Sequence, residues 1–388
     1  MNSYFIFFSM KVLFVTNEFS HPDLRETGGV GRFYKELSDE LVSCGHEVFV
    51  LGTNHVNLNC LDGGISFHII NKIFLLKDRF RLLSLVVNRV LLLIHFISFI
   101  KKHKIDVIEL NEPFTAYMIS FFKGNLPMIL RQHGMHSILS VMYGNKINKI
   151  VHFFEKKAHY YSDKIISVSK YTKKLVLDLY GRDLSVDVIY NGIRINDYEA
   201  NPEKEFNRSL LYVAALSDKK GYFDLVNIFN EINRIDDTVV LVIIGRESEF
   251  SFKTLKFTES ALDNIEYIGY LDYDKLCRHY GKSNLFLNFS KGETFGLTTI
   301  EAMSHNIPVV ISNIGVADEI VKNGVTGYVV NLHNKEEVLD KIFKILNDFS
   351  LQTKMGRLGG EIVIRSFTNK LMYQKTLDVY KKTQIEIK

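Results

Sequence analysis

The stretch Asn288-Phe-Ser-Lys-Gly-Glu293-Thr-Phe-Gly-Leu-Thr-Thr-Ile-Glu301-Ala-Met303 decides the interpretation of the chain. The apolar run 285–289 predicts a buried parallel strand, and the apolar positions after Gly296 predict a helix. The turn between them joins the carboxyl end of a strand to a helix start, where ligands bind in open α/β sheets. The first amide groups of such a helix lack carbonyl partners and lie at its positive dipole end, so they suit a phosphate.

Two acidic side chains flank the predicted phosphate position. Glu301 lies about a turn and a half beyond the helix start, where it can accept hydrogen bonds from a ribose, as an acidic residue does in dinucleotide folds. Glu293 precedes the helix, level with whatever the phosphate carries. A glutamate near a helix start is also favoured by the helix dipole alone, by about 0.3–1 kcal/mol. Spacing alone therefore leaves a structural and a functional explanation open.

The neighbouring residues favour the functional explanation. Glu293-Thr-Phe-Gly-Leu-Thr-Thr-Ile-Glu301-Ala-Met303, followed by Ile307-Pro-Val-Val-Ile311, resembles the donor-site signature of family 4 (group 1) retaining glycosyltransferases. The resemblance covers about residues 11–380 and is most specific over 288–330. It implies an α/β fold of GT-B architecture, in which two Rossmann-like, doubly wound domains face each other across a cleft. It also implies transfer of a sugar from a nucleotide-diphosphate sugar to a hydroxyl acceptor with retained anomeric configuration.

The resemblance assigns roles to individual residues. Glu293 orients the hydroxyls of the donor sugar, Glu301 takes the ribose, and Lys220 with the backbone at 295–298 holds the diphosphate. His133 lies near the sugar that is transferred, at the carboxyl end of a predicted strand, and a glycine pair approaches the donor phosphates. No cofactor and no metal is expected, because a lysine and a helix terminus carry the charge. The expected catalytic residues are Glu293, His133 and Lys220, and the expected donor-binding residues are Glu301, Phe295, Gly296, Leu297, Thr298, Gly28 and Gly29.

The chain departs from the family pattern at four places. Ser304-His-Asn306 replaces the usual Ala-x-Gly, and Asn306 is expected to end the helix in a left-handed conformation, for which asparagine is the second choice after glycine. Ala215 stands where relatives usually carry an arginine that would help to offset the charge of the departing diphosphate. Asn111 stands where many relatives carry a histidine, and Arg194 replaces an aspartate. Lys219, Lys291 or Arg246 could compensate for the missing arginine. Two alternatives therefore remain: a catalytically impaired GT-B subunit that binds a nucleotide or a partner, and another GT-B enzyme such as a nucleotide-sugar epimerase.

Composition limits the other classes. The 388 residues are 46% hydrophobic and 24% charged, which is typical of a globular protein of two or three domains. The formal charge of +4 is too small to indicate nucleic acid as a partner. The three cysteines lack metal-type spacing and are expected to be reduced thiols of a cytoplasmic protein. Residues 1–9 lack the basic region and cleavage site of a signal peptide.

The order of strand and helix patterns predicts the domains. We expect an acceptor-side Rossmann-like domain at 1–194, a linker at 195–207, a nucleotide-sugar donor domain at 208–366, and a C-terminal helix at 367–388. The resemblance implies that this last helix crosses back to the first domain. In the first half, strand 11–16 is followed by the loop Gly28-Gly-Val-Gly31, a helical pattern and a strand at 45–51.

Residues 82–100 form a long apolar helix pattern. The length suffices to span a membrane, but Asn88, Arg89 and His95 argue against a span. The sequence favours a helix buried among others. The alternative is a helix that rests on an anionic membrane surface, with Lys101, Lys102 and Lys104 at its basic end. That alternative would bring the protein to the inner face of the membrane, where a glycan or lipid-linked acceptor of bacterial surface polysaccharide or glycolipid assembly is found.

Overall fold

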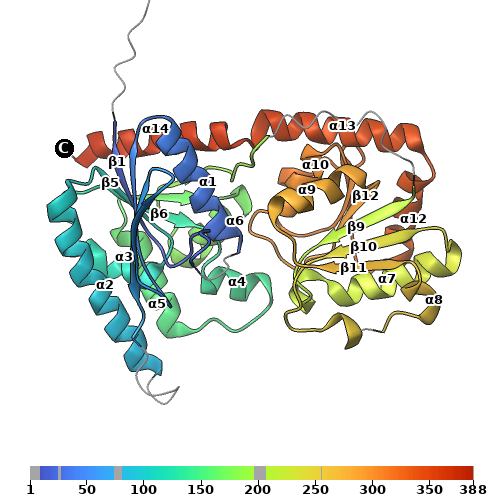
Figure 1. Ribbon diagram of the computed structural model, residues 1–388, viewed down its shortest axis with the longest axis horizontal. Helices are drawn as coiled ribbons and strands as arrows, with labels where there is room; N and C mark the ends of the chain where they lie inside the picture. The colour runs from blue at the N-terminus through green and yellow to red at the C-terminus, as the bar shows by residue number, and fades with distance from the viewer. Residues whose placement is uncertain (1–8, 25–27, 74–80, 196–206, 255, 388) are drawn as a thin grey trace, which may run out of the picture. The chain divides into compact units, whose positions relative to one another are not determined.

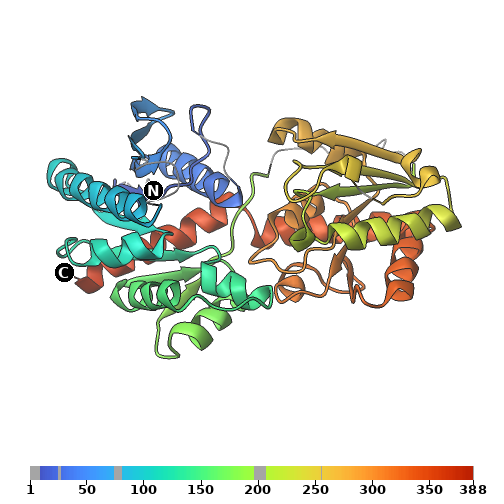
Figure 2. The same ribbon diagram turned by 90° about the horizontal axis from the view of Figure 1, so that it is seen from below.

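The computed structural model describes all residues except 1–8, 25–27, 74–80, 196–206, 255 and 388 (Figures 1 and 2). Its contacts divide the chain into two units. The first comprises Met1–Val141, Lys146–Gly192 and Asn369–Lys388, and the second comprises Met142–Asn145 and Ile193–Thr368. Of the linker expected at 195–207, only the two end residues are described, and of the N-terminal segment 1–9 only Ser9 is.

The first unit is built on an eight-stranded sheet in the order β3-β4-β2-β1-β5-β6-β7-β8. All neighbours are parallel except β3, which runs antiparallel to β4. The strand order reverses beside β1, which lies between β2 and β5, as in doubly wound sheets. The strands are β1 (Lys11–Val15), β2 (Glu47–Asn54), β3 (Leu58–Asp62), β4 (Ile65–Asn71), β5 (Val107–Leu110), β6 (Met128–Gln132), β7 (Lys164–Ser167) and β8 (Val186–Val188).

Helices cover both faces of this sheet because successive strand residues point to opposite sides. Val12 and Phe14 pack into a core that includes α1 and α14, whereas Leu13 and Val15 pack into a core that includes α2, α3 and α5. Both faces of the strands are therefore apolar, as the continuous apolar runs predict. The helices are α1 (Gly29–Ser43), α2 (Arg81–His103), α3 (Pro113–Ser120), α4 (His136–Met142), α5 (Lys149–Tyr161), α6 (Lys170–Tyr180) and α14 (Asn369–Ile387).

The second unit contains a six-stranded parallel sheet in the order β11-β10-β9-β12-β13-β14. Its order reverses between β9 and β12, which are adjacent, so their carboxyl-end loops lie side by side. The strands are β9 (Ser209–Val213), β10 (Val240–Ile244), β11 (Ile265–Gly269), β12 (Leu285–Asn288), β13 (Val309–Ser312) and β14 (Gly327–Val330). The helices are the 3-10 turns Asp218–Lys220 and Phe252–Thr254 with α7 (Tyr222–Ile235), α8 (Glu259–Leu262), α9 (Tyr273–Lys282), α10 (Leu297–Ser304), α11 (Ala317–Ile320), α12 (Lys335–Leu346) and α13 (Phe349–Ser366).

The helix predicted at 82–100 is present as α2, but the expectation that it is buried among other helices is wrong. Leu92, Phe96 and Phe99 pack against the sheet, whereas the opposite side of the helix is open. Over Leu83–His103 the helix is long and apolar enough to cross a membrane by length and composition, with only 17% of the window buried. Its exposed apolar side chains are Leu83, Leu85, Val86, Val90 and Ile94, each 41–58% exposed.

Candidate active site

The residues at the reversal of the second sheet form the centre of the candidate site. The loop after β9 carries Lys220, and the loop after β12 carries Glu293 and Ser290. The Lys220 Nζ lies 2.6 Å from Glu293 Oε1, and the hydroxyl of Ser290 donates a hydrogen bond of 2.9 Å to the same oxygen. The lysine side chain is 33% exposed and the glutamate side chain 16%. The structure thus joins two of the three expected catalytic residues in one ion pair.

Backbone contacts hold the two loops against each other. Gly221 has a φ of 72°, and a Cβ at this position would lie 1.8 Å from the carbonyl oxygen of Phe289. Only glycine combines this conformation with this close approach. The amide of Lys291 donates a hydrogen bond of 2.9 Å to the carbonyl of Lys219, which is a second contact between the two loops. The position of Lys220 beside Glu293 is therefore fixed by the backbone rather than by the side chains alone.

The charge of the pair is set by partial burial and by the partner. Burial alone would lower the pKa of Lys220, but the negative charge of Glu293 and the hydrogen bond to it more than offset this effect, so the pKa is raised. Lys220 is consequently a cation over the whole physiological pH range. A fixed cation in a partly dehydrated loop suits a phosphate or diphosphate group.

The start of α10 adds backbone donors beside the pair. Gly296 precedes the helix with a φ of 90° and a ψ of 53°, a left-handed conformation that glycine adopts without strain. The amides of Leu297 and Thr298 open the helix, where no preceding turn supplies a carbonyl. Phe295 is buried against Phe367, with ring centroids 5.8 Å apart, and anchors the turn. The expected diphosphate position is therefore a helix N-terminus of sound geometry.

Glu301 lies in the interior of the second unit. It is 1% exposed, and Tyr280 of α9 donates a hydrogen bond of 3.1 Å to its Oε2. Spacing along α10 placed Glu301 beside a phosphate but did not predict this burial. The tyrosine was missed because α9 is separated from Glu301 by 21 residues in the sequence.

The other expected catalytic residue, His133, belongs to the first unit and follows β6. Its ring lies 4.5 Å from the ring of Phe33, and burial, followed by the charge of Arg131, lowers the pKa of His133 well below its usual value. Arg131 itself is fully buried and makes a two-point ion pair with Glu109, at 2.7 and 2.9 Å. His133 is therefore a neutral imidazole.

The glycine pair also belongs to the first unit. Gly28 caps the N-terminus of α1 and is exposed, and a Cβ there would meet no atom within 4 Å. Gly29 and Gly31, expected in the loop, lie in the first turn of the helix instead. The loop is thus shorter than predicted, because the helical pattern begins before its first large apolar residue.

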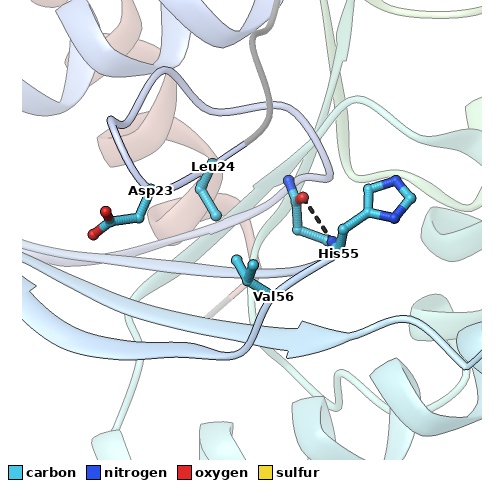
Figure 3. A pocket seen from close by; sticks show the side chains of 5 residues that line it. Asp23, Leu24, His55 and Val56 are labelled. Atoms are coloured by element: carbon cyan, nitrogen blue, oxygen red, sulfur yellow. Dashed lines mark hydrogen bonds between the residues drawn. The ribbon is translucent and has the colours of Figure 1, made fainter.

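A shallow pocket at the carboxyl edge of the first unit's sheet was not predicted (Figure 3). It lies where the segment after β1 meets the end of β2, and Asp23, Leu24, Asn54, His55 and Val56 line it. The side chain of Asn54 accepts a hydrogen bond of 2.7 Å from the amide of His55 (Figure 3). None of these residues falls in a motif, so the sequence gave no signal for them. Within the described part of the chain, no group of three or more His, Cys, Asp or Glu residues could hold a metal ion.

Comparison with protein families identifies the chain. The family described as Glycosyl transferases group 1 matches residues 194–360, and the family described as Glycosyltransferase Family 4 matches residues 27–197. The chain belongs to the group 1 (family 4) glycosyltransferases. These two matches meet near residue 195 and together cover every strand of the two sheets except β1.

Individual relatives agree with this assignment. An uncharacterized glycosyltransferase of Methanocaldococcus jannaschii is 25% identical, covering 96% of this chain and 98% of the relative. The capsular polysaccharide biosynthesis glycosyltransferase CapM of Staphylococcus aureus is 25% identical, covering 60% and 64%.

Solved structures agree on the fold. Sucrose-phosphate synthase from Thermosynechococcus elongatus has a TM-score of 0.81 at 17% identity, covering 96% of this chain and 98% of that one. Anabaena HepE in complex with UDP and glucose has a TM-score of 0.73 at 17% identity, covering 96% and 99%. The two-sheet, Rossmann-like architecture is therefore that of GT-B glycosyltransferases, as predicted.

Proposed function

We propose that this glycosyltransferase transfers a hexosyl or related sugar from a nucleotide-diphosphate sugar to a hydroxyl acceptor, with retention of the anomeric configuration. The observation that carries the proposal is the Lys220–Glu293 pair at the reversal of the second sheet, beside the first amides of α10. In the reaction, the bond from the anomeric carbon to the diphosphate breaks and a bond to the acceptor oxygen forms. The electron pair of the broken bond stays on the departing diphosphate, on which negative charge builds, and that diphosphate takes up the proton of the acceptor hydroxyl.

The proposed roles follow from the chemistry of these groups. Lys220 and the amides at 297–298 stabilise the charge of the departing diphosphate, a contribution that is electrostatic and needs no metal. Glu293 accepts hydrogen bonds from the sugar, and Glu301 accepts them from the ribose. His133 stands near the anomeric carbon in this proposal. Because His133 is neutral, its ring offers a hydrogen bond rather than a positive charge.

The relatives suggest the biological setting. CapM acts in capsular polysaccharide biosynthesis, and HepE was solved with UDP and glucose, so a UDP-hexose donor and bacterial surface polysaccharide or glycolipid assembly are proposed here. The acceptor is a glycan or lipid-linked glycan at the inner face of the membrane. The protein is cytoplasmic, contacts anionic lipid through α2, and takes no part in nucleic-acid binding.

A donor screen that scores release of nucleoside diphosphate tests the proposal. Purified protein is incubated with UDP-, GDP- and dTDP-sugars and a mixture of glycan and glycolipid acceptors. We expect acceptor-dependent release with one donor, loss of release in Glu293→Gln, and the same anomer in product and donor by NMR. Release by Glu293→Gln equal to wild type would contradict the assignment, and an inverted product would contradict retention.

Flotation with lipid vesicles tests the contact through α2. We expect binding to anionic vesicles at low salt, loss of binding at high salt, and weaker binding when Lys101, Lys102 and Lys104 are changed to Glu. Each engaged lysine is expected to contribute about 1 kcal/mol. Equal binding to neutral vesicles at high salt would show that the basic end of α2 is not the cause.

A second candidate is a catalytically impaired subunit, which Ala215 favours. A Cβ at Gly245, which follows β10, would lie 1.8 Å from the carbonyl oxygen of Ala214, the residue before Ala215. The loop after β9 is therefore closely packed against the end of β10. If the subunit is impaired, wild type binds nucleoside diphosphate without release from any donor, and Ala215→Arg restores release. An epimerase would instead convert the donor sugar without an acceptor, which the same NMR measurement detects.

A further inference from the structure

The outer surface of α3 and α5 in the first unit carries large apolar side chains that are open to solvent. These two helices and α2 cover the same face of the sheet, and α3 packs against both of its neighbours. Of the 24 large hydrophobic side chains exposed in the described part of the chain, 11 lie on this layer of helices or directly at its ends. We call five of them the aromatic surface: Phe121 (58% exposed), Phe122 (50%), Ile150 (71%), Phe153 (51%) and Tyr161 (46%).

The spacing along α5 places this surface on one side of the helix. Ile150, Phe153, Lys157 and Tyr161 follow each other at intervals of three, four and four residues, which is one helical face. The opposite face packs inward, where Ala158 is completely buried. Glu155 and His159 are buried on that inward face as well, so it is partly polar. Ile150, Phe153 and Tyr161 lie on the exposed face instead.

The aromatic rings of the surface continue into the packing between the helices. Phe153 contacts Phe154 with ring centroids 5.5 Å apart, and Phe154 contacts Tyr117 of α3 at 6.0 Å. Phe121, just after α3, lies 5.7 Å from Tyr161. Because the exposed rings rest on half-buried ones, they are held in place and lose little conformational freedom when they bind.

The net charge of this part of the chain is positive. Residues 81–161 contain eleven Lys or Arg and four Asp or Glu, a formal +7, whereas the whole chain carries +4. Each of the four acids is engaged in the fold, as a partner of Lys11, Arg131, Arg89 or Tyr180: Asp106, Glu109, Glu112 and Glu155. Just beyond, Asp163 pairs with Lys123, and Asp183 accepts a hydrogen bond from Tyr160.

Lysines stand among the rings themselves. The Nζ of Lys157 lies 5.7 Å from the ring centroid of Phe153 and 6.0 Å from that of Tyr161. Lys156 is exposed on the same helix. Aromatic side chains with interspersed lysines match the boundary of a lipid bilayer, where rings sit at the headgroup level and lysine stems reach outward to phosphate.

We propose that the aromatic surface is a second membrane contact, which seats its rings in the interface of an anionic bilayer beside the contact made by α2. The inference deepens the proposed function, since it rests on a lipid-linked acceptor for its purpose. A second copy of the chain fits the surface poorly. A symmetric dimer would bring lysines against lysines, with the acids of residues 81–161 already engaged.

Vesicle flotation of the full chain tests the proposal. The first variant is Phe121→Ser with Phe153→Ser, and the second is Lys156→Glu with Lys157→Glu. Vesicles of phosphatidylcholine with and without phosphatidylglycerol are the probes, and circular dichroism checks the fold. Two pairs of changes outside the surface serve as controls: Phe349→Ser with Ile364→Ser, at side chains 54% and 61% exposed, and Lys354→Glu with Lys370→Glu.

We expect the aromatic variant to bind anionic vesicles at least tenfold more weakly, the lysine variant about fivefold more weakly per lysine, and both controls as wild type. The effects should add to those of the changes at the basic end of α2. Release of nucleoside diphosphate with a soluble acceptor should be unchanged, so that failure of transfer and failure of this contact are separate results. Unchanged flotation of both variants, or a monomer–dimer equilibrium that the variants abolish, would overturn the proposal.

Discussion

Replacing Lys220 by Met should weaken the binding of nucleoside diphosphate by about 1.5–2 kcal/mol, a factor of roughly 10–30. A hydrogen bond to a charged group contributes about 1.5–3 kcal/mol. The lower end applies here for two reasons. The side chain of Lys220 is one-third exposed, at 33%, so solvent screens its charge, and Glu293 already occupies its Nζ at 2.6 Å. The binding free energy that a phosphate gains is therefore only the difference between its own interaction with Lys220 and the interaction of Glu293 with Lys220.

The same competition predicts the effect of Glu293→Gln. Without the carboxylate, Lys220 keeps its charge but loses its anionic partner, so nucleoside diphosphate should bind as in wild type or slightly more tightly. Turnover should fall at least tenfold, because the contacts of Glu293 with the sugar act in the transition state. Of the two members of this ion pair, only Lys220 is therefore expected to weaken nucleotide binding when it is replaced.

Isothermal titration calorimetry with UDP and GDP measures both affinities, and the donor screen measures turnover. Lys291→Met is the matched control, because Lys291 lies in the same loop as Glu293 and pairs with Asp218 while being 44% exposed. Affinity of Lys220→Met equal to wild type, or an equal loss in Lys291→Met, would refute the placement of the diphosphate at Lys220.

Three further predictions concern buried groups. Glu301→Ala should weaken nucleotide affinity by about 1–3 kcal/mol in calorimetry, and equal affinity would remove Glu301 from the donor site. Glu109→Gln should lower the free energy of unfolding by about 3–5 kcal/mol, because it leaves Arg131 charged and unpaired; urea unfolding measures this, and Glu109→Gln with Arg131→Met should recover most of the loss. Burial lowers the pKa of His159 to about 4, so the unfolded chain takes up the proton first and stability falls as the pH drops from about 6.5 to 4, by about 3 kcal/mol. His159→Gln should flatten that part of the stability–pH curve, and an unchanged slope would contradict the assignment.

Most of the fold could be predicted from the long apolar runs and the glycines of the sequence. The strands predicted at 11–16 and 285–289 are confirmed as β1 and β12, and the helix predicted after Gly296 is confirmed as α10. Asn306 was expected to end that helix in a left-handed conformation, and its φ is 55°. These features depend on local preferences, which a sequence displays directly.

Features that depend on distant partners were not predictable. The β3–β4 hairpin was missed because β3 is mostly exposed and shows no apolar alternation. The exposed side of α2 was not predicted, because an apolar sequence does not show which faces of its helix pack against the rest of the protein. Burial of Glu301 depends on Tyr280, and the loop–loop contact at Gly221 depends on Phe289. Each requires knowledge of which strands are neighbours.

The neighbouring strands also bear on which cation could compensate for the arginine that is missing at Ala215. Lys291 is engaged with Asp218 of the loop after β9, so its charge is already balanced within the loops that it joins. Arg246 follows β10 directly, and its carbonyl accepts a hydrogen bond of 3.0 Å from the amide of Leu216. Because β10 and β9 are parallel neighbours, the arginine emerges beside Ala215 at the same edge of the sheet. The backbone thus places Arg246 at the strand end next to that of Ala215, which keeps Arg246 a candidate for the compensating cation.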